Sequence, residues 1–355
     1  MLGGPVGGCQ EAIGRIAALA GWRCAASGPH RAARVPWRGA CATAALIRSE
    51  RCARQTPAGL PGRSALVLTW ADGGALLAVL IWGVSFPVLK AIMTVMDPLT
   101  LMLVVWLFAL AVLATVLGRV GAWRLPAHEE VPGLLTVSLV GFTLNQILYS
   151  WGLHLTTASH SGLIFTVSPL VVFGLSQALG QVRMRRLDAF GLALGVGGAA
   201  LIVGWPASGA AGEASLLGDL LTVGAAITWG VWTVLAAPIL RRRGTLNGTF
   251  WISLTGTLGL IPFALPGLVA QDWALPWWAF AGILYSGAAG GALGSLLWYA
   301  AVRRLGAART AIYANMESFF AVLAAALLLG EQVAVMSIVG GVAVVAGVLL
   351  TRRSG

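Results

Sequence analysis

Residues 74–94 read GALLAVLIWGVSFPVLKAIMT, and this stretch decides how the rest of the chain is interpreted. Almost every residue in it is apolar, and Lys90 is its one charged residue. A helix that crosses a lipid bilayer needs about 20 predominantly apolar residues. The stretch therefore predicts a membrane-spanning helix. Pro87 predicts a kink in that helix, because proline cannot donate the backbone hydrogen bond to residue i−4.

The composition of the whole chain agrees with this first helix. The 355 residues are 58% hydrophobic and only 10% charged, and the mean hydropathy is +0.86. A soluble domain carries about 25% charged residues. This chain has too few charges to coat a soluble globule or to keep a disordered chain open, so both classes are excluded. The composition indicates a protein whose solvent is lipid.

Working outward from residues 74–94, turn signals divide the chain into ten apolar stretches. The signals include Asp97-Pro98, Arg124-Leu125-Pro126, the Ala, Gly and Ser residues of 206–215, and Asp272-Trp273. The fold class predicted from them is all-α and integral to the membrane, with ten transmembrane helices. The predicted spans are 74–94, 98–117, 133–153, 159–180, 189–205, 218–239, 246–268, 277–299, 308–329 and 334–350.

The charged residues of the core predict its orientation, because cytoplasmic loops are enriched in Lys and Arg. With both ends of the ten-helix core in the cytoplasm, the opposite loops carry Asp97, Glu213, Asp272 and Glu331, with Lys90 as the one base nearby. The cytoplasmic loops and tail then hold all thirteen core arginines: Arg119, Arg124, Arg183, Arg185, Arg186, Arg241, Arg242, Arg243, Arg303, Arg304, Arg309, Arg352 and Arg353.

The formal charge of +11 is concentrated near the N-terminus. Residues 1–63 hold nine arginines against two acids, a balance of +7, and residues 64–355 hold fourteen bases against ten acids, a balance of +4. The basic excess is therefore no argument for a nucleic-acid partner. Residues 1–72 are interpreted as a basic N-terminal extension. A disordered tail, a targeting peptide and sequence translated from upstream of the natural start all stay open.

A repeat relates the two halves of the core. Trp82-Gly83-Val84 recurs 147 residues later as Trp229-Gly230-Val231, and Gly180-Gln181 recurs 150 residues later as Gly330-Glu331. Five spans in each copy is an odd number, so the second copy enters the membrane in the opposite orientation. Inverted repeats are the architecture of many alternating-access carriers. The predicted parts are a first repeat at 73–205, a linker at 206–217, a second repeat at 218–350 and a cytoplasmic tail at 351–355.

Five motifs in this order carry a resemblance to a known family: Trp82-Gly83-Val84-Ser85-Phe86, Ser168-Pro169, Gly218-Asp219-Leu220, Trp229-Gly230 and Asn315-Met316-Glu317-Ser318-Phe319-Phe320. Over residues 73–350 the chain resembles the EamA-type ten-helix transporters of the drug/metabolite transporter superfamily, which contain two EamA repeats. It departs from their pattern at Gln181, where a glutamate is usual, and at Ser318, where a proline is usual. The resemblance implies secondary transport, in the outward direction, coupled to protons.

Glu317 is an acidic residue that the sequence places near the middle of a span, the ninth. A charged side chain at the centre of a membrane helix costs about 2.5–3.5 kcal/mol on insertion scales, so it should face the bundle interior or a watery cavity. A role as a substrate ligand or proton acceptor and a role as a structural, hydrogen-bonded acid both stay open. Tyr313 lies on the same predicted helix face and Asn315 on another, and both are further candidates.

Two other groups of residues are candidates for the binding site. Asn145, Gln146 and Tyr149 place amide and hydroxyl groups in the third predicted span. Such groups suit polar metabolites, but they also join helices through hydrogen bonds. Trp82 and Trp229 belong to the repeated Trp-Gly pairs, and their rings either line a cavity or pack between helices.

Motifs of other protein classes are missing from the sequence. Lys90 is the one lysine and follows Leu89, so there is no Walker A motif. His128-Glu129-Glu130 does not continue to HExxH, and no GxSxG occurs. A membrane enzyme would need His, Asp or Glu clustered near one interface, and the core has no such cluster. We therefore expect no catalytic residue, no metal and no cofactor.

The sequence thus favours a secondary active transporter that exports a small polar or amphipathic metabolite, an amino-acid-like compound or a drug, across the cytoplasmic membrane by alternating access. The expected partners are that small molecule, the lipid bilayer and, from the resemblance, protons. A homodimer stays open, because glycine-rich helix faces serve folding and dimerisation alike. The alternative is a non-transporting membrane sensor or scaffold with the same fold.

Overall fold

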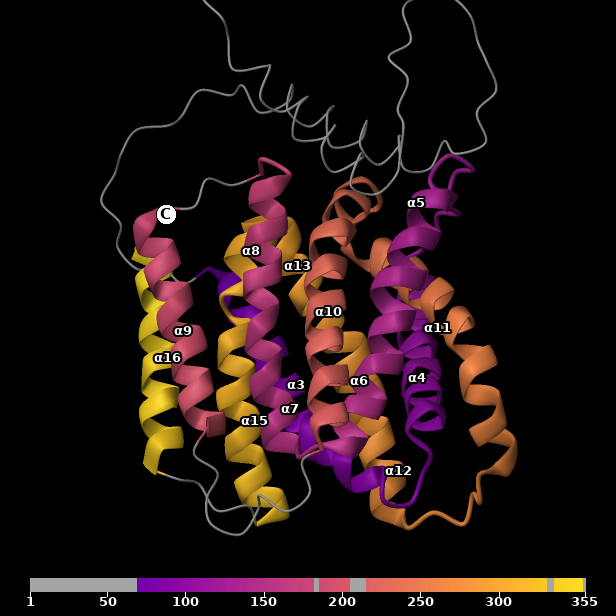
Figure 1. The fold of residues 1–355 in the computed structure, drawn as a ribbon. Helices are drawn as coiled ribbons and strands as arrows, with labels where there is room; N and C mark the ends of the chain where they lie inside the picture. The colour runs from indigo at the N-terminus through magenta and orange to yellow at the C-terminus, as the bar shows by residue number, and fades with distance from the viewer. Residues whose placement is uncertain (1–68, 182–184, 205–214, 331–334, 354–355) are drawn as a thin grey trace, which may run out of the picture.

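The computed structural model describes residues 69–181, 185–204, 215–330 and 335–353, and these residues are helical apart from their connections (Figure 1). Residues 1–68, Glu213 and Glu331 lie outside this description. In chain order the elements are α3 (Trp70–Ile92), α4 (Pro98–Arg119), α5 (Val131–Thr136), η1 (Val137–Thr143), α6 (Leu144–Leu155), α7 (Ala158–Ile164), η2 (Phe165–Val167), α8 (Ser168–Ala178), α9 (Arg186–Gly204), α10 (Leu216–Arg243), α11 (Thr245–Ala270), α12 (Trp277–Leu284), η3 (Tyr285–Gly294), α13 (Ser295–Leu305), α14 (Ala307–Ala311), α15 (Ala314–Leu329) and α16 (Val335–Arg353).

Eight segments of the described chain are long and apolar enough to cross a membrane. They correspond to the first four predicted spans and to spans six to nine. Two further helices, α9 and α16, have 19 residues each and cover the predicted spans 5 and 10. They pack along each other at one side of the bundle (Figure 1). The chain is therefore a multi-pass, all-helical membrane protein.

Several helices extend beyond the apolar stretches that predicted them. The helix α3 begins at Trp70, because Thr69 and Asp72 cap its N-terminus reciprocally. The helix α10 continues through three arginines and ends at Gly244, which has a φ of 79°. The helix α13 likewise continues to Leu305, before Gly306 with a φ of 86°. Arginines end the apolar stretch of the sequence, but their positive charge is favourable in the last turn of a helix. Both helices therefore continue through the arginines and stop before the glycine, whose positive φ ends a helix.

The central helices pack across the two halves of the sequence. In the first half, α3 packs against α13 and α15 of the second half. In the second half, α10 packs against α6 and α8 of the first half. The helix α4 packs against α11 and η3. The middle of the bundle is therefore built jointly by both halves, as Figure 1 shows around α3, α6, α10 and α15.

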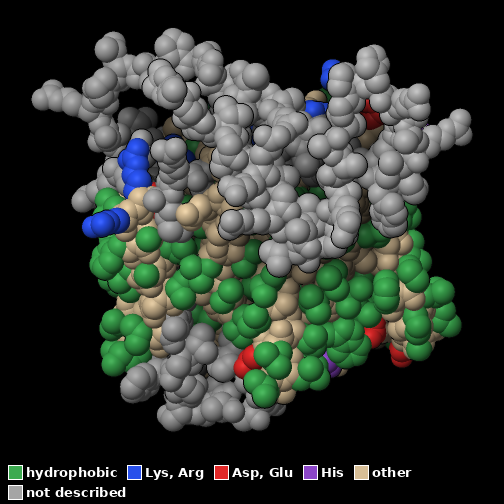
Figure 2. All heavy atoms as spheres, turned by 45° about the horizontal axis from the view of Figure 1, so that its top comes forward, with side chains coloured by type: hydrophobic (Ala, Val, Ile, Leu, Met, Phe, Trp, Pro, Cys, Tyr) green, Lys and Arg blue, Asp and Glu red, His purple; other side chains and the backbone are tan. Residues whose placement is uncertain are grey.

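One end of the bundle gathers the arginine side chains, and we name it the arginine end. There Arg243 of α10 donates hydrogen bonds to Glu130 and to the carbonyl of Arg124. Arg304 of α13 lies 4.6 Å from the ring centre of Trp70, at the start of α3. Figure 2 shows the visible Lys and Arg side chains toward one edge of this face, and most of the visible acidic side chains, with His, toward the other.

Hydrophobic side chains cover most of the described flank between these two edges (Figure 2). Large apolar residues such as Phe263 and Leu327 are 55% and 76% exposed. Soluble proteins rarely expose apolar patches of this extent, so the flank is the surface that meets lipid.

Four of the eight segments are interrupted along their length. The third and seventh contain the π-helices η1 and η3. The fourth contains the 3₁₀ turn η2, directly before Ser168-Pro169. The eighth is divided between α14 and α15, at Ile312 and Tyr313. Such interruptions often mark functional sites, and two of them, η2 and η3, contribute residues to the internal cavity described next.

Candidate functional site

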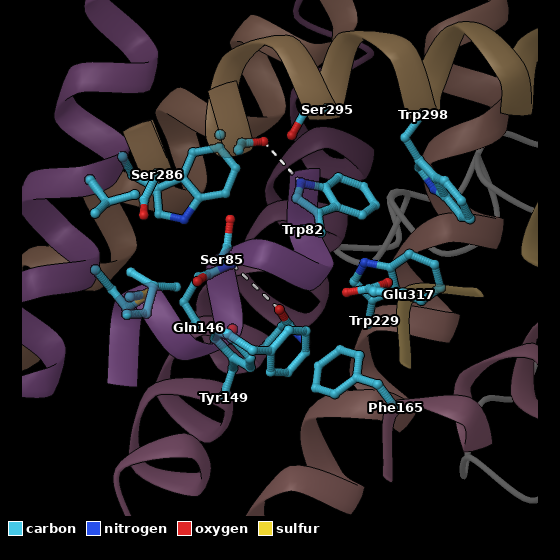
Figure 3. A pocket seen from close by; sticks show the side chains of 18 of the residues that line it. Trp82, Ser85, Gln146, Tyr149, Phe165, Trp229, Ser286, Ser295, Trp298 and Glu317 are labelled. Carbon is cyan, nitrogen blue, oxygen red and sulfur yellow. Dashed lines mark hydrogen bonds between the residues drawn. The ribbon is translucent and has the colours of Figure 1, made fainter. Parts of the chain in front are cut away.

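A cavity of about 110 Å³ lies within the bundle, with space for several water molecules. Its walls come from α3, α4, α6, η2, α10, η3, α13 and α15, so both halves of the chain contribute. We name it the central cavity. Figure 3 shows the side chains that line it. The labelled residues are Trp82, Ser85, Gln146, Tyr149, Phe165, Trp229, Ser286, Ser295, Trp298 and Glu317.

Three tryptophans from three helices form one wall of the central cavity, and we name them the Trp triad. The ring centres of Trp229 and Trp298 are 5.0 Å apart. The ring of Trp82 lies 5.4 Å from Trp298 and 6.3 Å from Trp229. Contacts of this kind stabilise by about 0.5–1.5 kcal/mol per pair beyond the area they bury. The triad therefore joins α3, α10 and α13 around the cavity.

The π-helix η3 holds Trp82 in place. Its indole N–H donates a 2.9 Å hydrogen bond to the backbone carbonyl of Gly290. A side chain at Gly294 would collide with the same indole nitrogen, since a Cβ there would lie 2.7 Å from it. The donor of Trp82 is thus used inside the protein, and what its ring offers to the cavity is its π-face.

A second aromatic group lines another part of the cavity. Phe86, Tyr149 and Phe165 contact one another edge to face, with ring centres 5.5–5.7 Å apart. They come from α3, α6 and η2, which again joins distant parts of the first half. The central cavity therefore has mostly aromatic walls, a feature typical of pockets for small organic molecules.

Glu317 is the one charged residue among those that line the central cavity. It lies in the first turn of α15, and only 6% of its surface is exposed. In the described part of the chain, no group donates a hydrogen bond to its carboxylate and no base pairs with it. Figure 3 shows the carboxylate among the labelled aromatic residues. A carboxylate in this setting requires a proton or a cation from elsewhere.

Gly83 allows Glu317 to lie this deep in the bundle. A Cβ at Gly83 would lie 2.6 Å from the Cβ of Phe320 and 2.9 Å from the carbonyl oxygen of Glu317. The absence of a side chain lets α15 pack closely on α3, next to Trp82. Gly230 has the matching position in α10, where a Cβ would lie 3.0 Å from the carbonyl of Ser168 in α8. Both Trp-Gly pairs therefore combine an aromatic wall with a close helix contact.

Asn145 and Gln146 line the cavity, but Asn145 also joins two helices. Its side-chain amide donates to the carbonyl of Ala225 in α10 at 2.7 Å and to Thr228 at 3.3 Å. The amide of Gln146 donates a long, 3.5 Å bond to Asn145. Asn145 thus acts mainly as an interhelical hydrogen-bonding residue, while Gln146 keeps its carbonyl oxygen for other contacts.

The structure brings six of the eight candidates from the sequence to the central cavity: Trp82, Asn145, Gln146, Tyr149, Trp229 and Glu317. The other two lie outside its lining. The hydroxyl of Tyr313 donates a 2.6 Å hydrogen bond to Asp72 of α3. Asn315 is buried beside Gly195 of α9. Tyr313 directly precedes α15 as its N-cap residue, and its hydroxyl bonds to Asp72, whereas Glu317 lines the cavity.

Several lining residues were not among the candidates. Trp106, Phe165, Trp232 and Tyr299 are apolar or aromatic residues inside apolar spans, so nothing in the sequence distinguishes them from packing residues. Trp298 carried one signal, because it lies 147 residues after Trp151 in the repeat. Trp151 itself is 36% exposed and is not part of the lining.

Metal ligands are not grouped in the part of the chain that the structure describes: no three His, Cys, Asp or Glu side chains lie together there. What remains is a bundle with apolar flanks, an aromatic internal cavity and one buried carboxylate. This is the architecture of a membrane transport protein for small molecules.

The comparison with known proteins gives the family. The chain belongs to the EamA-like transporter family, which matches residues 69–204 and 216–353 as two successive copies. An uncharacterised transporter of Archaeoglobus fulgidus is 28% identical over 276 residues, which are 78% of this chain and 94% of that protein. A protein of Streptantibioticus cattleyicolor named "Probable terminal-alkyne amino-acid exporter" is 28% identical over 278 residues, 78% of this chain and 91% of that protein.

A solved crystal structure shares the fold. It superposes with a TM-score of 0.63 at 17% sequence identity and covers 80% of this chain and 98% of its own chain. At this identity the likeness concerns the fold alone.

Proposed function

We propose that the chain is a secondary active transporter that exports a small polar or amphipathic metabolite across the cytoplasmic membrane by alternating access. The observation that carries this proposal is Glu317, a buried carboxylate that has no hydrogen-bond or ion-pair partner among the described residues and lies in a cavity built by both halves of the chain. A structural acid would be hydrogen-bonded to a neighbouring helix. A ligand-binding acid keeps its oxygens for the substrate or for a proton.

Helix packing supports an inverted repeat of two five-helix units. The contacts of α3 with α13 and α15 correspond to the contacts of α10 with α6 and α8 when the halves are exchanged. The pairs α4 with α11 and α9 with α16 each join equivalent helices. Such pseudo-symmetry lets two similar packings alternate and open a central site to one side and then to the other. In this proposal α9 and α16 complete ten transmembrane helices.

The arginine end supports an orientation with both ends of the core in the cytoplasm. Arg124, Arg243 and Arg304 all lie at this end, and basic loops stay in the cytoplasm during membrane insertion. The name of the Streptantibioticus relative supports an amino-acid-like substrate. Competition between a proton and a substrate for Glu317 would couple export to the proton gradient.

The experiment is a comparison of extracellular metabolites from cells that overproduce the protein and cells that lack it. The proposal expects at least one small metabolite to accumulate outside the overproducing cells. Identical extracellular profiles, together with no flux of the cell's metabolites in proteoliposomes, would contradict transport. That result would favour the non-transporting sensor or scaffold.

A further inference from the structure

Some polar groups around Glu317 are used inside the protein, and others are left for a ligand. The indole N–H of Trp82 is used by the carbonyl of Gly290. The hydroxyl of Ser85 donates to the carbonyl of Ile81 at 2.9 Å, so its remaining lone pairs can only accept. The amide of Asn145 donates to α10. The indole N–H groups of Trp232 and Trp298 and the hydroxyl of Ser286 have no hydrogen-bond partner among the described residues, so hydrogen bonding alone does not decide the charge of a ligand.

The charge in the cavity has one sign. Glu317 is its one carboxylic acid, and none of the residues that line it is Lys, Arg or His. A ligand carboxylate would therefore find no cationic partner there and would be repelled by Glu317. A ligand ammonium group would neutralise the buried carboxylate. Its hydrogen bonds would replace those that the carboxylate loses when it is removed from water.

The aromatic walls of the central cavity also favour a positively charged ligand. The face of a tryptophan attracts a cation within about 6 Å of the ring centre, and the attraction grows when water is excluded. The Trp triad presents three indoles in mutual contact, and Trp229 and Trp298 are 8% and 1% exposed. Carbon-rich residues such as Leu89, Met102 and Val105 line the rest of the cavity, where an apolar body can lie.

We propose that the central cavity selects organic cations: protonated or quaternary amines with an apolar or aromatic body and no carboxylate. The ammonium group binds between Glu317 and the indole faces of the Trp triad, and the body packs on the remaining apolar wall. Binding follows from the cavity alone, whereas movement of the cation across the membrane rests on the proposed function. The cavity is therefore expected to bind amines more tightly than zwitterionic amino acids of the same size.

Three compounds with the same phenyl body test this selectivity: phenethylamine is a cation, phenylalanine a zwitterion and 3-phenylpropionate an anion. Their binding to the purified full chain in detergent is measured by calorimetry. We expect phenethylamine to bind at least tenfold more tightly than phenylalanine, and 3-phenylpropionate to bind most weakly. Equal binding of phenethylamine and phenylalanine, tighter binding of the anion, or no binding of any of the three overturns the inference.

Two pairs of variants locate the cation. Glu317→Gln should weaken phenethylamine binding tenfold or more, while Glu129→Gln, the same change at an exposed residue, should leave it unaltered. Trp229→Leu should weaken binding more than Trp229→Phe, because phenylalanine keeps a π-face. Leucine at Trp277, which is 80% exposed, is the matching control. Full phenethylamine affinity in a correctly folded Glu317→Gln protein contradicts the assigned site.

A second readout separates this inference from the proposed function. Uptake of labelled phenethylamine and phenylalanine is followed in proteoliposomes that contain the full chain. Preferential uptake of the amine supports both proposals. Uptake of phenylalanine but not of the amine leaves transport standing and overturns cation selectivity. Tight binding of the amine, with no flux of either compound and no metabolite accumulating outside overproducing cells, leaves the cation site standing and contradicts transport.

Discussion

Glu317 and Asp72 are both buried acids, but their surroundings give them different roles. Asp72 is 4% exposed and accepts hydrogen bonds from Thr69 and from the hydroxyl of Tyr313. Glu317 is 6% exposed and receives no hydrogen bond within the described residues. Asp72 is therefore a structural acid that fixes the start of α3 against the segment before α15. Glu317 lacks such partners in the described residues, and for this reason we propose it as the acid that binds a ligand or a proton.

The first prediction concerns Tyr313. Its replacement by phenylalanine removes the hydrogen bond to the buried carboxylate of Asp72, and a bond to a charged group contributes about 1.5–3 kcal/mol. Tyr313→Phe should lower the thermal stability of the purified protein in detergent. Tyr299→Phe is the control, because this buried hydroxyl has no hydrogen-bond partner in the described chain. Equal stability of the two variants would contradict the structural role of Tyr313.

Glu317, the two repeated tryptophans and Tyr313 show which site residues the sequence could predict and which it could not. Glu317 was found because a charge inside an apolar span is conspicuous, and Trp82 and Trp229 because they repeat. Tyr313 was grouped with Glu317 by its spacing, but it lies at the break between α14 and α15, and its hydroxyl bonds to Asp72 outside the cavity lining. Helix interruptions depend on packing between distant segments, so the spacing of residues in one span cannot reveal them.

At the scale of elements, close contact between α3 and α15 positions the site. Gly83 is the point of contact, and no other residue has a side chain small enough to leave this approach unchanged. The sequence showed the Trp-Gly repeat but not which helix approaches each glycine. That information lies in contacts between residues more than 200 positions apart, such as Gly83 and Glu317, which no local pattern records.

The second prediction tests this contact. Gly83→Ala places a methyl group 2.6 Å from the Cβ of Phe320, so α15 must move, at a cost of about 1–3 kcal/mol. Gly73→Ala in the same helix meets no atom within 4 Å and is the matched control. Thermal unfolding in detergent should show a loss for Gly83→Ala and little change, or a small gain, for Gly73→Ala. The reverse order would contradict the packing of α3 on α15.

The third prediction concerns the connection between α10 and the segment before α5. Arg243 donates to Glu130, to the carbonyl of Arg124 and to Asn247, and its side chain is 6% exposed. Arg243→Gln should destabilise the protein by about 1–3 kcal/mol, because the carboxylate of Glu130, the carbonyl of Arg124 and the amide oxygen of Asn247 lose a charged donor. Arg242→Gln, at an exposed neighbour, should have little effect in the same thermal measurement. Equal losses of thermal stability in the two variants would contradict the role of Arg243 in joining α10 to the segment before α5.

At the scale of the whole molecule, the sequence predicted more than it did at the site. Eight of the ten predicted spans are helices that meet the length and hydropathy of a membrane crossing, and α9 and α16 occupy the remaining two. This succeeds because lipid imposes one requirement, about 20 apolar residues, on every span. A second simple rule is that basic residues gather in the loops on one side of the membrane. The structure places Arg124, Arg243 and Arg304 at one end of the bundle.

The fourth prediction tests which side of the membrane the arginine end faces. Single cysteines replace Arg242 or Asp272, both exposed, in a chain whose four natural cysteines are changed to serine. A membrane-impermeant maleimide should label cysteine at position 272 in intact cells, because Asp272 lies at the opposite end. Cysteine at position 242 should react only after lysis. Labelling of position 242 in intact cells would invert the proposed orientation.

The central claim is that the chain is a carrier whose central cavity works through the Glu317 carboxylate. The most direct measurement is the export rate of the metabolite that accumulates outside overproducing cells, compared between the unaltered protein, Glu317→Gln and Glu129→Gln at equal amounts in the membrane. We predict a loss of tenfold or more for Glu317→Gln and an unchanged rate for Glu129→Gln. Export by the Glu317→Gln protein at the unaltered rate would contradict the account.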